Sequence, residues 1–228
     1  METKDIDFSK LSPMMKQYFE VKNKYKNHIL FYRLGDFYEM FFDDAIIASR
    51  ELELTLTGRD CGLEERAPMC GVPHHACDVY LKKLIEKGYN VAICEQTMDP
   101  AMCKGIVPRE VIRVVTPGTL IESSMLDETS NNYICAFYMR AKESALCLAD
   151  ISTGEVHLFE FEGKEMTSSA INELSRFSPA EILINDSFLS NKELSSFIRE
   201  KLKTSVQLLE ENDCLLYTSD AADDSLRV

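Results

Sequence analysis

An aromatic residue and a carboxylate stand two positions apart just after a glycine, at Phe37 and Glu39. They belong to the stretch RLGDFYEMFFDDA, residues 33–45, which follows a short apolar run. An aromatic ring displayed on a turn can wedge into a DNA base step from the minor groove and kink the duplex. A nearby carboxylate can hydrogen-bond an exposed base edge. Because a carboxylate also repels DNA phosphates, the aromatic residue and the carboxylate together favour a DNA site that deforms easily.

Two other interpretations of this stretch remain open from the residues alone. Phe37 and Phe41 lie four positions apart and could be core residues on one helical turn. Asp36, Glu39 and Asp44 could form a metal-dependent nuclease site, since Mg²⁺ prefers oxygen ligands. The spacing is poor for a metal, and no lysine or histidine stands beside these acids. Acids in the first turn of a helix are also explained by the helix dipole.

Other catalytic and cofactor patterns are weak. Residues 163–165 (GKE) come nearest to the sequence pattern of a phosphate-binding loop, but they lack both its upstream glycine and its hydroxyl residue. The histidines stand beside no nucleophile signature, so we expect no enzyme activity, metal or cofactor in this chain. A Cys/His-rich stretch lacks the spacing of paired zinc ligands and is interpreted as a loop with incidental thiols. Its candidate ligands are Cys61, Cys70, His74, His75 and Cys77.

The composition indicates a globular protein. The chain has 228 residues, 45% of them hydrophobic, which is enough for one large or two ordinary domains. Its formal net charge of −13 argues against holding nucleic acid mainly by phosphate neutralisation. The net negative charge concentrates in the second half, so DNA contact by the near-neutral first half would rest on shape and specific groups. The absence of long apolar runs and of CxxC pairs predicts a cytoplasmic protein with reduced thiols and no membrane partner.

The elements that position these groups follow from hydrophobic periodicity and turn residues. Ser12 and Pro13 indicate a helix start, and Gly88 indicates a helix end. Residues 57–73 are rich in turn formers and are predicted to be a loop whose end, residues 68–73, is extended. The alternation of elements predicts an α/β domain with a mixed sheet. The predicted helices are 12–26, 43–52 and 75–87, and the strands are 28–34, 89–94 and 110–115.

A second unit is expected after residues 121–132, which have the polar composition of a linker. Three closely spaced strand candidates predict a β-meander. They are residues 133–137, 145–150 and 155–161, followed by a helix at 168–177, a strand at 181–184 and a helix at 191–202.

Four sequence blocks, in this order, resemble the N-terminal part of the MutS family of DNA mismatch-recognition proteins. They are GDFYEMFFDDA, APMCGVPHHACDVYLKKLIEKGYNVAICEQTMDP, KGIVPREVIRVVTPGT and DISTGEV, and the likeness covers roughly residues 9–210. The resemblance implies an α/β protein with an N-terminal mixed-sheet mismatch-binding domain at 1–125 and a linker at 126–132. A truncated RNase H-like connector domain without nuclease activity is implied at 133–213.

The resemblance also implies a function, which is recognition of base–base mismatches and small insertion/deletion loops to initiate mismatch repair. Phe37 would insert beside the mispaired base and Glu39 would hydrogen-bond it. The implied partners are mismatched double-stranded DNA, a second copy in a homodimer and the MutL matchmaker, with ATP and Mg bound by an ATPase domain absent here. A free-standing partner-binding module remains an alternative. Further candidate DNA contacts, placed in loops or turns, are Arg33, Asp36, Tyr38, Arg59 and Met69.

Residues 214–228 depart from the family pattern. The segment CLLYTSDAADD at 214–224 back-translates to a transposase-type sequencing adapter, so we expect a non-native tail that packs on nothing. A divergent native tail is the alternative.

Overall fold

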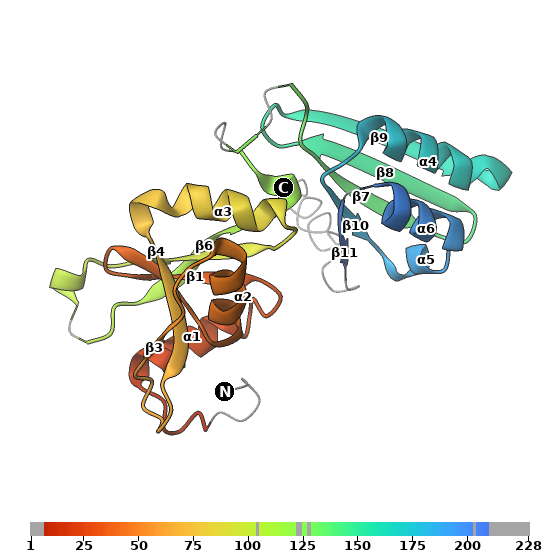
Figure 1. The fold of residues 1–228 in the computed structure, drawn as a ribbon. Helices are drawn as coiled ribbons and strands as arrows, with labels where there is room; N and C mark the ends of the chain where they lie inside the picture. Colours follow the sequence, from red (N-terminus) through yellow and green to blue (C-terminus); the bar gives the residue numbers. More distant parts are fainter. Residues whose placement is uncertain (1–6, 104, 122–124, 127–128, 203, 210–228) are drawn as a thin grey trace, which may run out of the picture. The chain divides into compact units, whose positions relative to one another are not determined.

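A computed structural model describes residues 7–103, 105–121, 125–126, 129–202 and 204–209. The chain forms two compact units that divide between Pro117 and Gly118 (Figure 1). The predicted linker at 126–132 lies partly outside the described residues, and the predicted tail at 214–228 lies wholly outside them. None of the described helices has the length and apolar character needed to cross a membrane.

The first unit is built on a six-stranded mixed sheet in the order β3-β4-β2-β1-β5-β6. Strands β1 and β5 are parallel, and the other neighbours are antiparallel. The α/β class and mixed sheet expected from the sequence are therefore confirmed. The elements are α1 (Pro13–Lys22), β1 (Ile29–Leu34), β2 (Phe37–Phe41), α2 (Phe42–Leu52), β3 (Thr57–Arg59), β4 (Ala67–Pro73), η2 (His74–Ala76), α3 (Cys77–Glu86), β5 (Val91–Gln96), η3 (Pro100–Met102) and β6 (Arg109–Val115), and η4 (Pro117–Thr119) spans the division between the units.

The two faces of this sheet bury different side chains, because successive strand residues point to opposite faces. Helix α1 packs on the face that carries Leu30, Tyr32 and Phe41, where Met15 and Tyr18 complete the core. Figure 1 shows α1 and α3 on opposite sides of the sheet. Helix α1 covers only part of this face, and the rest of it carries exposed side chains such as Phe37.

Three predictions for the first unit are wrong. Residues 37–41 form β2, so the interpretation of Phe37 and Phe41 as neighbours on a helical turn fails. The predicted loop at 57–73 contains strand β3, although its predicted extended end at 68–73 is confirmed as part of strand β4, and the predicted helix at 12–26 ends at Lys22. Pairing with distant strands overrides the local turn-forming composition in both strand regions. The strand at 28–34 and the helix at 75–87 are confirmed within one or two residues.

The second unit has a five-stranded sheet in the order β11-β10-β7-β8-β9. The predicted meander is confirmed, because β7 and β8 pair antiparallel, as do β8 and β9. Its three described helices share one buried cluster with one face of the sheet. The sequence did not predict α5 or β11. The elements are β7 (Tyr133–Met139), β8 (Glu143–Asp150), β9 (Glu155–Glu162), η5 (Gly163–Glu165), α4 (Met166–Phe177), β10 (Glu181–Ile184), α5 (Asp186–Leu189), α6 (Lys192–Lys201) and β11 (Ser205–Leu208).

Candidate nucleic-acid interface

A two-residue turn, Gly35 and Asp36, joins β1 to β2, and Leu34 pairs with Phe37 across it. Gly35 has φ +58°, which the first position of a tight hairpin turn requires and which glycine adopts without a Cβ penalty. The carbonyl of Asp36 accepts a hydrogen bond of 2.8 Å from the backbone N–H of His74. Strand β2 is also paired on both sides, with β1 and β4. The backbone that carries Phe37 is therefore held from two directions.

Phe37 displays its ring to solvent from this held backbone. Phe37 is 47% exposed, whereas Tyr38 is 5% exposed and Phe41 is fully buried. Large aromatic residues usually bury most of their surface, so an exposed ring on a strand end needs another explanation than packing. The arrangement has the form of a wedge at the tip of a hairpin.

The strand register sorts the candidate residues onto two faces. Residues directly opposite each other in an antiparallel pair point to the same face. Glu39 lies opposite Gly71, and Phe41 lies opposite Met69, which in turn lies opposite Thr57. The expectation that these candidates lie in loops or turns is wrong for all but Asp36. Phe37, Glu39, Arg59 and Met69 share the face that α1 partly covers, Arg33 and Tyr38 occupy the other face, and Asp36 lies in the turn.

Glu39 forms an ion pair with Arg59 on this shared face. The Nη1 of Arg59 donates to Oε2 of Glu39, and the side chains are 37% and 16% exposed respectively. Gly71, opposite Glu39, has no side chain, and a Cβ there would lie 3.3 Å from the carbonyl oxygen of Tyr38 and 3.5 Å from Glu39 Cγ. The carboxylate is thus oriented, and its charge is offset by a neighbouring cation.

The candidates on the opposite face form a separate cluster around Glu95. The hydroxyl of Tyr38 donates to Oε1 of Glu95, and Nη1 of Arg33 lies 3.4 Å from the same oxygen. The Arg33 guanidinium also lies 5.6 Å from the centroid of the Tyr38 ring. Burial, and then the hydrogen bond to Glu95, raise the pKa of Tyr38 well above its ordinary value. These contacts connect Arg33 and Tyr38 to β5 within the fold.

The sequence analysis missed Arg109, a buried arginine that braces the hairpin. Its Nε donates a hydrogen bond of 2.7 Å to the carbonyl of Arg33, which lies 76 residues away in the chain. Its Nη1 donates to Oε1 of Gln17 at 3.1 Å, and its guanidinium stacks 5.0 Å from the centroid of the Tyr32 ring. The β1–β5 pairing ends at Tyr32 and Cys94, so Arg109 takes over support of β1 just before the turn.

The nuclease alternative is not favoured, because its three acids have separate surroundings. Asp44 is buried, and its Oδ1 lies 2.8 Å from the Nζ of Lys22. Its Oδ2 accepts a hydrogen bond of 3.0 Å from the backbone N–H of Leu30. Burial raises the pKa of Asp44. Asp36 lies in the turn, and Glu39 pairs with Arg59.

The zinc candidates also have ordinary surroundings in the fold. The Sγ of Cys61 donates to the carbonyl of Glu65, and the Sγ of Cys70 donates to the carbonyl of Ala45. Both thiols are buried, as is Cys77. Within the described ranges, no three His, Cys, Asp or Glu side chains are grouped to hold a metal ion.

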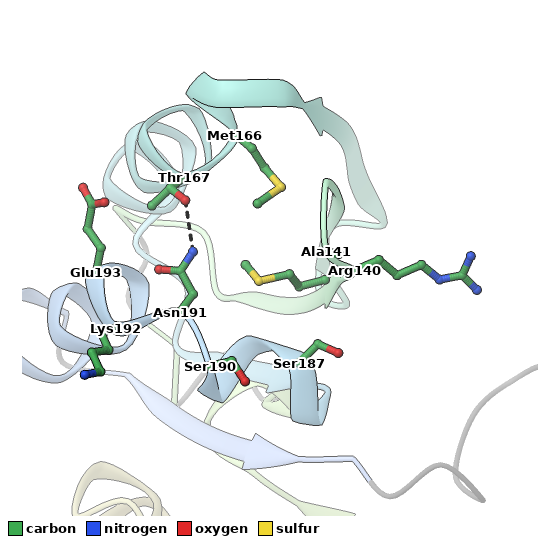
Figure 2. Close-up of a pocket in the computed structure, with 10 residues that line it drawn as sticks. Arg140, Ala141, Met166, Thr167, Ser187, Ser190, Asn191, Lys192 and Glu193 are labelled. Atoms are coloured by element: carbon green, nitrogen blue, oxygen red, sulfur yellow. Dashed lines mark hydrogen bonds between the residues drawn. The ribbon is translucent and has the colours of Figure 1, made fainter.

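The second unit contains a hollow of about 690 Å³ between the β7–β8 turn and the starts of α4 and α6. Figure 2 shows Asn191 and Thr167 on its wall, joined by a hydrogen bond of 3.0 Å. Asn191 also caps α6 by accepting from the backbone N–H of Leu194. The wall has no candidate residue from the sequence analysis. It is lined by Met139, Arg140, Ala141, Met166, Thr167, Ser187, Ser190, Asn191, Lys192 and Glu193.

Comparison with known proteins gives matches along most of the chain. The family model described as MutS domain I matches residues 12–124, and that of MutS domain II matches residues 132–227. The DNA mismatch repair protein MutS of Ruminiclostridium cellulolyticum is 52% identical over 201 residues, which are 88% of this chain and 23% of that protein. The MutS of Clostridium perfringens is 56% identical over 180 residues, 78% of this chain and 20% of that protein. The chain thus spans about a fifth to a quarter of the length of these relatives.

Proposed function

Since the chain belongs to the MutS family of DNA mismatch repair proteins, we propose that its first unit recognises base–base mismatches and small insertion/deletion loops in duplex DNA. Phe37 enters the minor groove beside the mispaired base, and Glu39 accepts a hydrogen bond from that base. Recognition at this step initiates repair. The other face of the sheet, with Arg33 and Tyr38, supports the hairpin rather than touching DNA.

One observation carries this proposal, which is the exposed ring of Phe37 on a hairpin tip whose backbone is held. Phe37 is 47% exposed, and the turn before it is fixed by Gly35 and by the hydrogen bond from His74 to Asp36. A wedge works only if its backbone resists being pushed back when the ring enters a base step. Glu39 lies on the same face two residues further along β2, which places a hydrogen-bond acceptor behind the wedge.

The physical basis of discrimination is the cost of deforming DNA. Unstacking one base step costs about a few kcal/mol in matched duplex. A mispair stacks and pairs poorly, so the same kink costs less there and the complex is more stable. The net charge of −13 fits this mechanism, because strong phosphate neutralisation would hold matched and mismatched duplex alike.

For the longer protein that the relatives represent, we propose an ATPase that binds ATP and Mg, acts as a homodimer, passes the signal to the MutL matchmaker and works in the cytoplasm. The described part of this chain has no cluster of side chains fit to hold the metal. The GKE at residues 163–165 also lacks the features of a phosphate-binding loop. The ATP and Mg site is therefore proposed for the part of the longer protein outside this chain.

The experiment compares binding of the 228-residue chain to two duplexes that differ only by one mispair, using fluorescence anisotropy at fixed salt. We expect tighter binding to the mispaired duplex, and loss of most of that preference in Phe37→Ala. Phe8→Ala is the matched control, because Phe8 is an equally exposed phenylalanine of the same unit, 48% against 47%. Equal binding of both duplexes by the wild type, or equal effects of the two substitutions, would contradict the proposal.

A further inference from the structure

We propose that Arg59 is the positioning residue of the mismatch site. Arg59 holds one carboxylate oxygen of Glu39, so that the other carboxylate oxygen faces the base. This inference rests on the proposed function, because it assigns Arg59 its role through Glu39. It differs from the reading of Arg59 as a direct contact to the DNA backbone. The two readings predict different dependence on residue 39, which makes them separable.

The geometry of the pair leaves one carboxylate oxygen available. Arg59 donates from Nη1 to Oε2 of Glu39, and in the described part of the chain Oε1 of Glu39 accepts no hydrogen bond. A carboxylate has two oxygens and room for about four hydrogen bonds, so pairing with one arginine does not exhaust it. An ionised carboxylate can only accept, so the base edge it reads has to present an N–H.

The sheet explains why Arg59 reaches Glu39 although β4 lies between their strands. Arg59 is the last residue of the edge strand β3, and its side chain crosses β4 on the shared face. Gly71 stands opposite Glu39 on β4 and has no side chain to block the approach. Met69, two residues before Gly71, flanks the same path. A larger residue at position 71 would crowd the carboxylate.

The electrostatic role follows from what an unpaired Glu39 would do near DNA. A free carboxylate at a minor groove repels phosphates and can adopt several rotamers, of which few direct an oxygen at the base. Arg59 offsets the charge and restricts the rotamers before DNA arrives, so less conformational entropy is lost on binding. Arg59 is the more exposed partner, 37% against 16% for Glu39, which places its guanidinium at the rim and the carboxylate behind it.

The test is a double-mutant cycle on the full 228-residue chain, with Arg59→Gln, Glu39→Gln and the double variant. Affinities for the matched and mispaired duplexes are measured at several salt concentrations. We expect Arg59→Gln to reduce the preference for the mispair by about fivefold when Glu39 is present, and by less than about twofold in the Glu39→Gln background. Arg66→Gln is the matched control, since Arg66 is an exposed arginine in the loop between β3 and β4.

Two results would overturn the inference. Equal weakening of both duplexes by Arg59→Gln, with a salt slope smaller by about one and no dependence on residue 39, would mean a direct phosphate contact. An additive cycle would mean that Arg59 and Glu39 act independently. Should Arg59→Gln not fold, Arg59→Lys in both backgrounds serves the same comparison. If the wild type shows no preference for the mispair, the proposed function fails together with this inference. A wild-type preference with an additive cycle refutes only the inference.

Discussion

Replacing Phe37 by alanine should cost the fold little, whereas replacing Phe41 four residues later should cost it much. Fully burying a phenylalanine side chain contributes about 1.5–3 kcal/mol. Phe37 is 47% exposed, so its ring contributes about half of that, roughly 1 kcal/mol, and its removal leaves no closed cavity. Phe41 is 0% exposed and packs edge-on against Tyr18 at 5.1 Å between ring centroids. Its truncation should cost about 3–5 kcal/mol, because a cavity remains in the core.

The assay is urea unfolding of both variants, with hydrogen exchange at the amides of β1 to follow the first unit separately from the second. Circular dichroism alone would mix the two units. We expect the exchange of the Phe31 and Tyr32 amides to be nearly unchanged in Phe37→Ala and strongly accelerated in Phe41→Ala. A loss of about 3 kcal/mol or more in Phe37→Ala would refute the reasoning, because it would make Phe37 a core residue rather than a displayed wedge.

Substitutions at three further positions, Asp44, Gly118 and Gly35, have expected outcomes. Asp44→Asn should lower the free energy of unfolding by about 2–4 kcal/mol near neutral pH, since it leaves the Lys22 ammonium without its carboxylate. Burial raises the pKa of Asp44 in the folded state above its pKa in the unfolded state. The stability that Asp44 contributes is therefore full below the unfolded-state pKa and is lost as pH rises through the folded-state pKa. The free energy of unfolding of Asp44→Asn, measured against pH, should lack this loss. Gly118→Ala should destabilise the second unit by about 1–3 kcal/mol in thermal unfolding, because the new Cβ would lie 2.8 Å from the Cβ of Glu181. Gly35→Val should cost about 1–2 kcal/mol at φ +58°, and anisotropy should show a smaller mismatch preference, whereas Gly35→Asn should be milder in both.

Elements with strong local periodicity could be predicted from the sequence. The run at β1 is apolar and aromatic apart from Arg33 and is followed by a glycine. Helix α3 combines apolar and charged residues before Gly88, whose φ of +83° follows the end of the helix. The β-meander of the second unit is likewise local, because each of its strands pairs with the next along the chain. Short-range patterns suffice for elements of this kind.

Strand β2 could not be predicted in the same way, and β4 could be predicted only as the extended end of a loop. β2 mixes aromatic and acidic residues and runs directly into α2, so its spacing of four between Phe37 and Phe41 imitates a helix. β4 contains two prolines and a glycine, which favour turns. Each becomes a strand because it pairs with the other and with a third strand, and those partners are set by the whole sheet.

The same limit separates the predicted and the missed parts of the site. The wedge and the acceptor, Phe37 and Glu39, are two residues apart, so a short motif is enough to suggest them. Arg59 is 20 residues from Glu39, and Arg109 is 76 residues from Arg33. Neither relation has a local signal, because each depends on which strands become neighbours.

The surroundings of Phe37 explain how an acidic chain can be suited to read DNA by its deformability. On the wedge's own face the Glu39 carboxylate is paired with Arg59, and on the opposite face the Glu95 carboxylate is shared by Arg33 and Tyr38. Glu39 and Glu95 are therefore each accompanied by a cation, whereas Asp36 lies in the turn itself. The two arginines offset these two carboxylates without giving this region a net positive charge that would hold matched duplex strongly. Under the proposed function, the preference for a mispair then depends on the difference in kinking cost, which a held backbone can transmit and a flexible loop cannot.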